Sequence, residues 1–160
     1  MRVKKKLRSG LAMTRIPTAV RVVAIALIDP QGRVLLQKRR AGGRHGGLWE
    51  FPGGKVERAE SPESALVREI AEELGVVVAP ADLHAEGEVA ENPAPRCDEP
   101  SLVLKLYRCA RWRGEPGCLD AAEIGWFTPA EAALLAVPPL DLPFVERLAA
   151  IAAAATGESA

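Results

Sequence analysis

The chain has 160 residues, of which 48% are hydrophobic and 26% charged, and its formal net charge is zero. That length suits a single domain with one core, and no apolar run reaches the roughly 20 residues of a membrane span. The balanced charge argues against a dedicated nucleic-acid binder. We therefore expect a monomer or homodimer in the cytoplasm, with no membrane partner and no stable nucleic-acid partner.

The N-terminal segment, residues 1–18, contains basic residues and no acidic residue. The basic side chains are Arg2, Lys4, Lys5, Lys6, Arg8 and Arg15. The segment lacks the apolar core of a signal peptide, so we expect a solvated, disordered tail before a domain that spans 19–156. The alternative is an electrostatic arm directed toward nucleic acid.

The first ordered segment is expected to begin at Val20. The run VRVVAIALI is short, β-branched and apolar on both faces, which is typical of a buried central strand. Residues 29–32, with the sequence DPQG, are typical of a type I turn. The return strand over 33–39 then predicts a hairpin. Four glycines within residues 41–47 predict a flexible loop after it.

Residues 62–74 have the pattern of an amphipathic helix. Ser61 can cap its start, Pro62 suits its first position, and Gly75 follows the last helical residue. One apolar face is formed by Leu66, Val67, Ile70, Ala71 and Leu74. We expect this face to pack against the core.

Three carboxylates, those of Glu69, Glu72 and Glu73, fall within an arc of roughly 100° on this helix. Such close carboxylates repel one another and raise their own pKa values unless a cation compensates them. The only basic residue between Ser61 and Val76 is Arg68. The cluster therefore predicts a bound cation.

The rest of the chain mixes strands and helices. Further strands are expected at 76–78, 86–90, 102–108 and 124–127, with a proline-rich loop over 91–100 and a turn at 112–116. A capping-box sequence starts a helix over 128–135, and a last helix covers 142–155. Hairpins and crossovers together, with helices on both faces, predict an α/β fold: an α/β/α sandwich with a mixed β-sheet.

Three cysteines, Cys97, Cys109 and Cys118, lack the CxxC spacing of metal sites. An odd number of cysteines without a secretory signal is typical of free thiols in a reducing cytosol. We expect free thiols, with a zinc or disulfide role as the alternative.

The helix and its glycine lead-in carry a specific motif. The fixed positions are Gly54, Glu60, Arg68, Glu69, Glu72, Glu73 and Gly75, with apolar Ile70 and Val76 between and after them. In residue types and spacing, the segment resembles the complete signature of the Nudix hydrolases. The resemblance independently implies the α/β/α Nudix fold.

The resemblance also implies roles for these residues. Residues that match Glu69, Glu72 and Glu73 bind Mg²⁺ in the family, Mn²⁺ being able to substitute, and a carbonyl of Gly53 or Gly54 often joins them. Arginines at the position of Arg68 orient the carboxylates, and Glu60 is expected to pair with that arginine. All five side chains are therefore assigned to catalysis. Carboxylates suit Mg²⁺ because it prefers hard oxygen ligands.

A further acid is expected from the loop before the last strand. Asp120 lies six residues before Trp126, where enzymes resembling MutT carry a metal-contacting glutamate, and Glu123 lies three residues before it. Asp120 is one methylene shorter than that glutamate. We assign Asp120 as a metal ligand, and a plain surface acid is the alternative for both Asp120 and Glu123. The general base stays open among Glu69, Asp120 and Glu123.

The lead-in GLWEFPGGKVE resembles the MutT branch of the family, and this resemblance extends from about Val22 to Leu148. It implies substrate-binding roles for Arg39, for Phe51 in the base pocket and for Asp141. MutT has an asparagine at the last position, whereas an ionised aspartate can only accept hydrogen bonds. Some relatives with aspartate there prefer cytidine triphosphates. Capping of the last helix is the structural alternative for Asp141.

These features predict a Mg²⁺-dependent enzyme that cleaves a nucleoside triphosphate, of the 8-oxo-dGTP type or another, to the monophosphate and pyrophosphate, in nucleotide-pool sanitation. A preference for CTP or dCTP, or another nucleoside diphosphate derivative such as ADP-ribose, is the alternative. A catalytically silent nucleotide-binding module is a third interpretation. The intact carboxylates argue against it, since a silent site has no need of a repulsive cluster.

Overall fold

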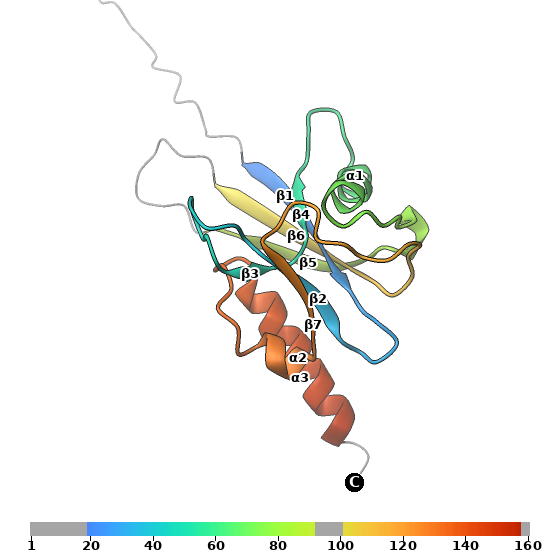
Figure 1. Ribbon diagram of the computed structural model, residues 1–160, viewed down its shortest axis with the longest axis vertical. Helices are drawn as coiled ribbons and strands as arrows, with labels where there is room; N and C mark the ends of the chain where they lie inside the picture. The colour runs from blue at the N-terminus through green and yellow to red at the C-terminus, as the bar shows by residue number, and fades with distance from the viewer. Residues whose placement is uncertain (1–18, 92–100, 158–160) are drawn as a thin grey trace, which may run out of the picture.

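The computed structural model describes residues 19–91 and 101–157 (Figure 1). The predicted basic tail, most of the proline-rich loop and Cys97 lie outside these residues. The elements are β1 (Val20–Leu27), β2 (Val34–Lys38), β3 (Trp49–Glu50), β4 (Gly53–Lys55), α1 (Pro62–Leu74), a 3₁₀ turn (Pro80–Asp82), β5 (His84–Ala90), β6 (Leu102–Cys109), β7 (Glu123–Phe127), α2 (Pro129–Ala132) and α3 (Leu142–Gly157).

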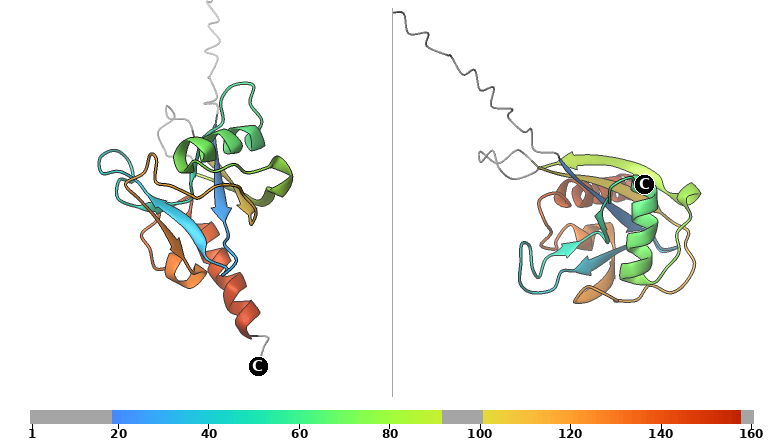
Figure 2. Two further views of the ribbon diagram at one scale, coloured as in Figure 1. Left: turned by 45° about the vertical axis from the view of Figure 1, so that its right-hand side comes forward. Right: turned by 90° about the horizontal axis from the view of Figure 1, so that it is seen from above.

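The strands form two sheets. The first has the order β4-β1-β6-β5, in which β1 and β6 are parallel and the other pairs antiparallel. The second, with the order β3-β2-β7, is antiparallel throughout. Figure 2 shows α1 and α3 on opposite sides of the strands. The predicted α/β/α arrangement with a mixed sheet is confirmed.

Alternate residues of β1 serve the two sides of the sandwich. Val23 belongs to the core cluster that contains Ile70 of α1, whereas Ala24 belongs to the cluster that contains Phe144 of α3. All residues from Val23 to Leu27 are buried. Because successive side chains of a strand point to opposite faces, a run that is apolar throughout suits a strand covered on both sides.

The predicted hairpin is wrong, although its turn forms. The Gly32 amide donates to the Asp29 carbonyl at 2.9 Å, but antiparallel pairing stops at the single bridge between Ile28 and Val34. β1 then pairs with β4 on one edge and with β6 on the other. Since neither edge is left for β2, that strand enters the second sheet instead.

Two other predicted elements are shorter than expected. Residues 76–78 contribute only an isolated bridge between Val77 and Arg113. The helix at Pro129 begins with the expected capping box but ends at Ala132, because the hydrogen bonds of Leu134 and Leu135 reach back three residues rather than four. The glycine lead-in, expected as a connection, supplies the short strands β3 and β4.

In the part of the chain that the structure describes, no helix combines the length and the apolar character needed to cross a membrane. Cys109 is buried and Cys118 exposed, and both are free thiols, as predicted for these two.

Candidate active site

The ends of α1 are fixed by local contacts. The Ser61 hydroxyl accepts a hydrogen bond from the Ser64 amide at 3.1 Å, and Pro62 occupies the first turn. Gly75 closes the other end in the left-handed conformation, with φ 70°, and its amide donates to the Ala71 carbonyl at 3.1 Å. Glycine adopts this conformation without a steric cost. The helix therefore has the bounds that the sequence predicts.

Arg68 connects α1 to the loop that precedes it. Its guanidinium donates to both carboxylate oxygens of Glu60 at 3.0 Å, to Oε1 of Glu69 at 2.9 Å and to the Lys55 carbonyl at 3.2 Å. Its Nη1 also lies 3.6 Å from Oε2 of Glu72. The hydrogen bonds from Arg68 hold the pKa of Glu60 below its usual value. The predicted pairing of Arg68 with Glu60 is present.

The Glu69 carboxylate lies directly over the glycine turn. A Cβ on Gly54 would come within 2.3 Å of Cδ of Glu69, and one on Gly53 would come within 2.0 Å of the Val23 carbonyl oxygen. Any side chain at either position would displace backbone or the carboxylate. Gly54 therefore allows the Glu69 carboxylate to lie against the turn, and Gly53 allows β4 to lie close to the backbone of β1.

Glu73, like Glu69, is a half-buried carboxylate of the cluster. Its Oε2 accepts from the Gly53 amide at 2.9 Å and from Nε2 of Gln37 at 3.2 Å. Burial raises the pKa of Glu73 to about 7; these two hydrogen bonds oppose the rise, and the nearby charges of Glu69 and Glu50 add to it. A cation would stabilise the ionised form of this carboxylate.

Gln37 was not predicted as a site residue. It is 4% exposed on β2, and its Nε2 also lies 3.4 Å from Oε1 of Glu50. Its Oε1 is buried and has no hydrogen-bond partner among residues 19–91 and 101–157. The sequence signal for it was a polar residue at the end of the otherwise apolar run VLLQ, at a position where a strand covered on both faces should be apolar.

A polar cavity of about 320 Å³ adjoins Glu73. It is lined by Gln37, Arg39, Arg40, Gly42, Glu50, Gly53, Glu73, Asp120 and Ala121. Asp120 reaches it because the segment before it binds the end of α1: the Gly117 amide donates to the Leu74 carbonyl and the Leu119 amide to the Glu73 carbonyl. Glu123 instead lies 3.9 Å from Nζ of Lys38, with its side chain 59% exposed.

The acidic side chains have the chemistry of a divalent-cation site but are not gathered around one point. Among the described residues, no three His, Cys, Asp or Glu side chains are grouped closely enough to hold a metal ion. Glu69 and Glu72 both turn toward Arg68, and the Glu72 side chain is 60% exposed. The donor set nevertheless fits such a cation, because hard carboxylate oxygens of Glu69 and of the half-buried Glu73 lie against the glycine turn.

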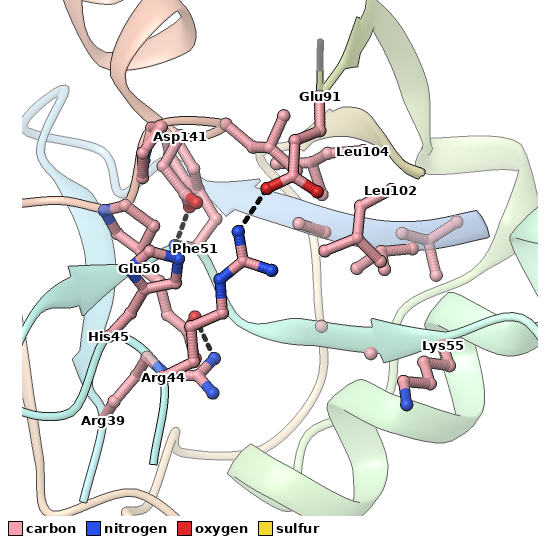
Figure 3. A pocket seen from close by; sticks show the side chains of 18 residues that line it. Arg39, Arg44, His45, Glu50, Phe51, Lys55, Glu91, Leu102, Leu104 and Asp141 are labelled. Carbon is pink, nitrogen blue, oxygen red and sulfur yellow. Dashed lines mark hydrogen bonds and ion pairs between the residues drawn. The ribbon is translucent and has the colours of Figure 1, made fainter. Parts of the chain in front are cut away.

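A second cavity, of about 300 Å³ and mainly apolar, brings together the three predicted substrate residues Arg39, Phe51 and Asp141. Its other lining residues are Val22, Val23, Ala24, Arg44, His45, Glu50, Gly53, Gly54, Lys55, Glu91, Leu102, Leu104, Pro138, Pro139 and Leu140. Figure 3 shows Arg44 of the glycine loop extending across this cavity to its ion-pair partner Glu91.

Asp141 is 6% exposed, and its Oδ1 accepts from the Phe51 amide at 3.0 Å (Figure 3). The alternative prediction, that the Asp141 side chain caps the last helix, is wrong. The amides of Phe144 and Val145 donate to the backbone carbonyl of Asp141 instead. Burial raises the pKa of Asp141 to about 7; the Phe51 amide opposes the rise, and Glu50 adds to it. The carboxyl is therefore fully ionised only above neutral pH, which differs from the ionised state assumed from the sequence.

The two cavities share Arg39, Glu50 and Gly53 as lining residues. Nη1 of Arg39 lies 2.8 Å from Oε2 of Glu50. A ligand with an apolar ring in one cavity and anionic groups in the other would therefore pass Arg39 at the junction.

The chain is similar to known proteins in sequence and in fold. The family model described as "NUDIX domain" matches residues 17–148. The CTP pyrophosphohydrolase of Escherichia coli (strain K12) is 36% identical over 135 residues, which cover 82% of this chain and 93% of that protein. The 8-oxo-dGTP diphosphatase of Proteus vulgaris is 32% identical over 94 residues, covering 59% of this chain and 79% of that protein. The solution structure of the E. coli ORF135 protein superposes with a TM-score of 0.73 at 30% identity, covering 86% of this chain and 94% of that one.

Proposed function

Because this chain belongs to the NUDIX domain family and is a hydrolase of nucleotide derivatives, we propose that it cleaves a nucleoside triphosphate to the monophosphate and pyrophosphate. We further propose that Mg²⁺ is the cation and that cytosine is the preferred base. The observation that carries this proposal is the continuity of the two cavities through Arg39 and Glu50. One cavity has the apolar walls and polar anchor that suit a base, and the other has the carboxylates that suit a metal-bound polyphosphate.

The preference for cytosine rests on Asp141. Since Oδ1 is engaged by the Phe51 amide, Oδ2 is the oxygen free to meet the base. An ionised Oδ2 is an acceptor, and the cytosine amino group is a donor. The similarity to a CTP pyrophosphohydrolase over most of both chains supports the same substrate.

The cation would be held by side chains of α1, by the glycine turn before it and by Asp120. Glu69, Glu72, Glu73 and the carbonyl of Gly54 would hold the cation, with Asp120 as a further ligand. Such a cation, when bound, neutralises charge on phosphate oxygens and lowers the pKa of bound water. Arg68 would keep Glu69 and Glu72 in place through the ion pairs described above.

In this arrangement the water that attacks the phosphate chain must lose a proton to a nearby base. Glu69 and Asp120 remain the candidates, and Asp120 has the better access to the polar cavity. Glu123 is disfavoured by its exposed pairing with Lys38. Arg39, which borders both cavities, would contact the phosphate chain or the base.

Oxidised dGTP is the second candidate substrate. The specific observation in its favour is the similarity to an 8-oxo-dGTP diphosphatase. An ionised Asp141 could also accept hydrogen bonds from the N–H and amino groups of a guanine edge. The same cavity thus suits either base class chemically, and kinetics must rank them.

The test is a turnover screen of CTP, dCTP, UTP, dGTP, oxidised dGTP and ADP-ribose with Mg²⁺, the products being separated by ion exchange. We expect the monophosphate and pyrophosphate, with the highest kcat/KM for CTP or dCTP. Release of a monophosphate from ADP-ribose alone would overturn the triphosphate assignment. Binding without turnover of any compound would favour the silent nucleotide-binding module.

A further inference from the structure

Gln37 is a buried polar side chain for which the catalytic assignment above has no role. It is 4% exposed, and in the part of the chain that the structure describes its amide oxygen is buried without a hydrogen-bond partner. An unsatisfied buried acceptor destabilises a fold, whereas an apolar side chain of similar volume would not. Core packing alone therefore does not explain glutamine at this position.

The amide nitrogen of Gln37 lies between two carboxylates. Nε2 donates to Oε2 of Glu73 at 3.2 Å and to Oε1 of Glu50 at 3.4 Å. Rotating the amide by 180° would place its oxygen against both carboxylates, so electrostatics fixes the observed orientation. The two carboxylates thus hold the amide in place even though its oxygen is left unpaired.

These contacts determine which oxygen of each carboxylate is left for other partners. Among the described residues, Glu73 accepts from Gly53 and Gln37, and both donate to Oε2, so Oε1 is the oxygen left for a ligand. Glu50 receives Gln37 on Oε1 and Arg39 on Oε2. The side chains therefore form a continuous chain of hydrogen bonds, Glu73–Gln37–Glu50–Arg39, from the metal side of the site to the junction of the two cavities.

We propose that Gln37 is a positioning residue of the active site, holding Glu73 for the cation and Glu50 for Arg39 at the same time. This inference rests on the proposed function, since it concerns the orientation of groups that act in hydrolysis. Gln37 lines the polar cavity but not the apolar one, so it reaches the apolar cavity only through Glu50 and Arg39.

The first test compares Gln37→Met with the wild-type protein and with Gln31→Met, a matched control in the exposed turn before β2. Methionine keeps the length of the side chain but has neither the donor nor the unpaired acceptor. We expect kcat for CTP to fall about tenfold, the effect of one hydrogen bond to a charged group. KM should change less than about threefold, because the cavity for the base is intact.

The second readout is Mn²⁺ binding without nucleotide, measured by the paramagnetic resonance of free Mn²⁺. We expect weaker binding by Gln37→Met, a wild-type melting temperature for that variant, and no change in Gln31→Met. Wild-type kcat and Mn²⁺ affinity in Gln37→Met would overturn the proposal. So would a lower melting temperature with unchanged Mn²⁺ affinity, because that result describes a purely structural residue.

A second variant covers the case in which Gln37→Met does not fold. Gln37→Glu keeps the shape but replaces the donor with a third negative group facing Glu50 and Glu73. We expect the kcat of Gln37→Glu to fall more than about tenfold. We also expect Mn²⁺ to raise the melting temperature of Gln37→Glu by more than it raises that of the wild type. Wild-type turnover by Gln37→Glu would also refute the positioning role. If the wild-type protein itself neither hydrolyses nucleotides nor binds Mn²⁺, the proposed function fails rather than the role of Gln37.

Discussion

The substitution Asp141→Asn tests how the base is selected, because the structure determines where the new amide group must lie. Oδ1 of Asp141 accepts from the Phe51 amide at 3.0 Å, and both residues are buried. The asparagine oxygen can keep this hydrogen bond only if its NH₂ group takes the place of Oδ2. The group that we propose to face the base therefore changes from an acceptor to a donor.

This exchange should reverse the discrimination between two bases of equal size. Cytosine carries an amino donor where uracil carries a carbonyl acceptor, so Asp141 favours CTP and Asp141→Asn favours UTP. One mismatched group in a buried pocket costs about 1–3 kcal/mol, which is roughly a 5- to 150-fold change in the kcat/KM ratio. The kcat/KM values should be measured at about pH 8.5, well above the Asp141 pKa of about 7, so that this carboxyl is ionised.

The assay compares kcat/KM for CTP and UTP, together with melting temperatures, in the wild type, Asp141→Asn and Asp141→Ala. Asp82→Asn, on the 3₁₀ turn, makes the same chemical change away from both cavities. Asp141→Ala should lower both discrimination and stability, because the buried Phe51 amide loses its acceptor. If the ratio of kcat/KM for CTP to that for UTP is unchanged in Asp141→Asn, Asp141 does not select the base. Its role is then only to accept the hydrogen bond from the Phe51 amide.

Three further predictions concern the carboxylates. Glu73→Gln keeps the shape but removes a ligand charge, so kcat should fall by roughly 10²-fold or more while the variant still folds. Wild-type turnover by this variant would contradict the proposal that α1 holds the cation. Excess chelator should abolish hydrolysis and Mg²⁺ or Mn²⁺ restore it, since the proposed site needs a divalent cation; activity that persists in chelator would count against it. Burial raises the pKa values of Glu73 and Asp141 to about 7. Between about pH 4 and pH 8 the folded metal-free protein therefore retains protons that the unfolded chain has lost. Its free energy of unfolding should fall as the pH rises through this range. Denaturant titrations should show a shallower fall in Glu73→Gln and Asp141→Asn, and equal slopes in all three proteins would refute these raised pKa values.

The helix of the signature could be predicted because its determinants are local. Ser61 bonds to an amide three residues away and Gly75 to a carbonyl four residues back. The apolar positions repeat with the period of the helix, so their common face follows from geometry. The same motif places Arg68 between Glu60 and Glu69, and these pairs are present in the structure. Sequence alone was therefore sufficient for the family, the helix and the pairing of Arg68.

Contacts between distant segments required the tertiary structure. The turn at Asp29–Gly32 follows from its residues, yet the strands on either side enter different sheets because β4 and β6 occupy both edges of β1. A strand apolar on both faces carries no local signal for its partner, since many pairings would bury it equally well. Local patterns therefore predicted β1 as an element but not its neighbours.

The same distinction applies to the site. The Asp141 side chain bonds to an amide 90 residues earlier in the chain, and Gln37 meets a carboxylate 36 residues later. The raised pKa values of Asp141 and Glu73 come mainly from burial, which depends on how the whole chain packs around them. The sequence by itself identified the carboxylates and Arg68 of the proposed site, but not Gln37. Only the tertiary structure decided which of them are buried and which oxygens are left for a ligand, because hydrogen-bond partners and desolvation are set by segments far apart in the chain.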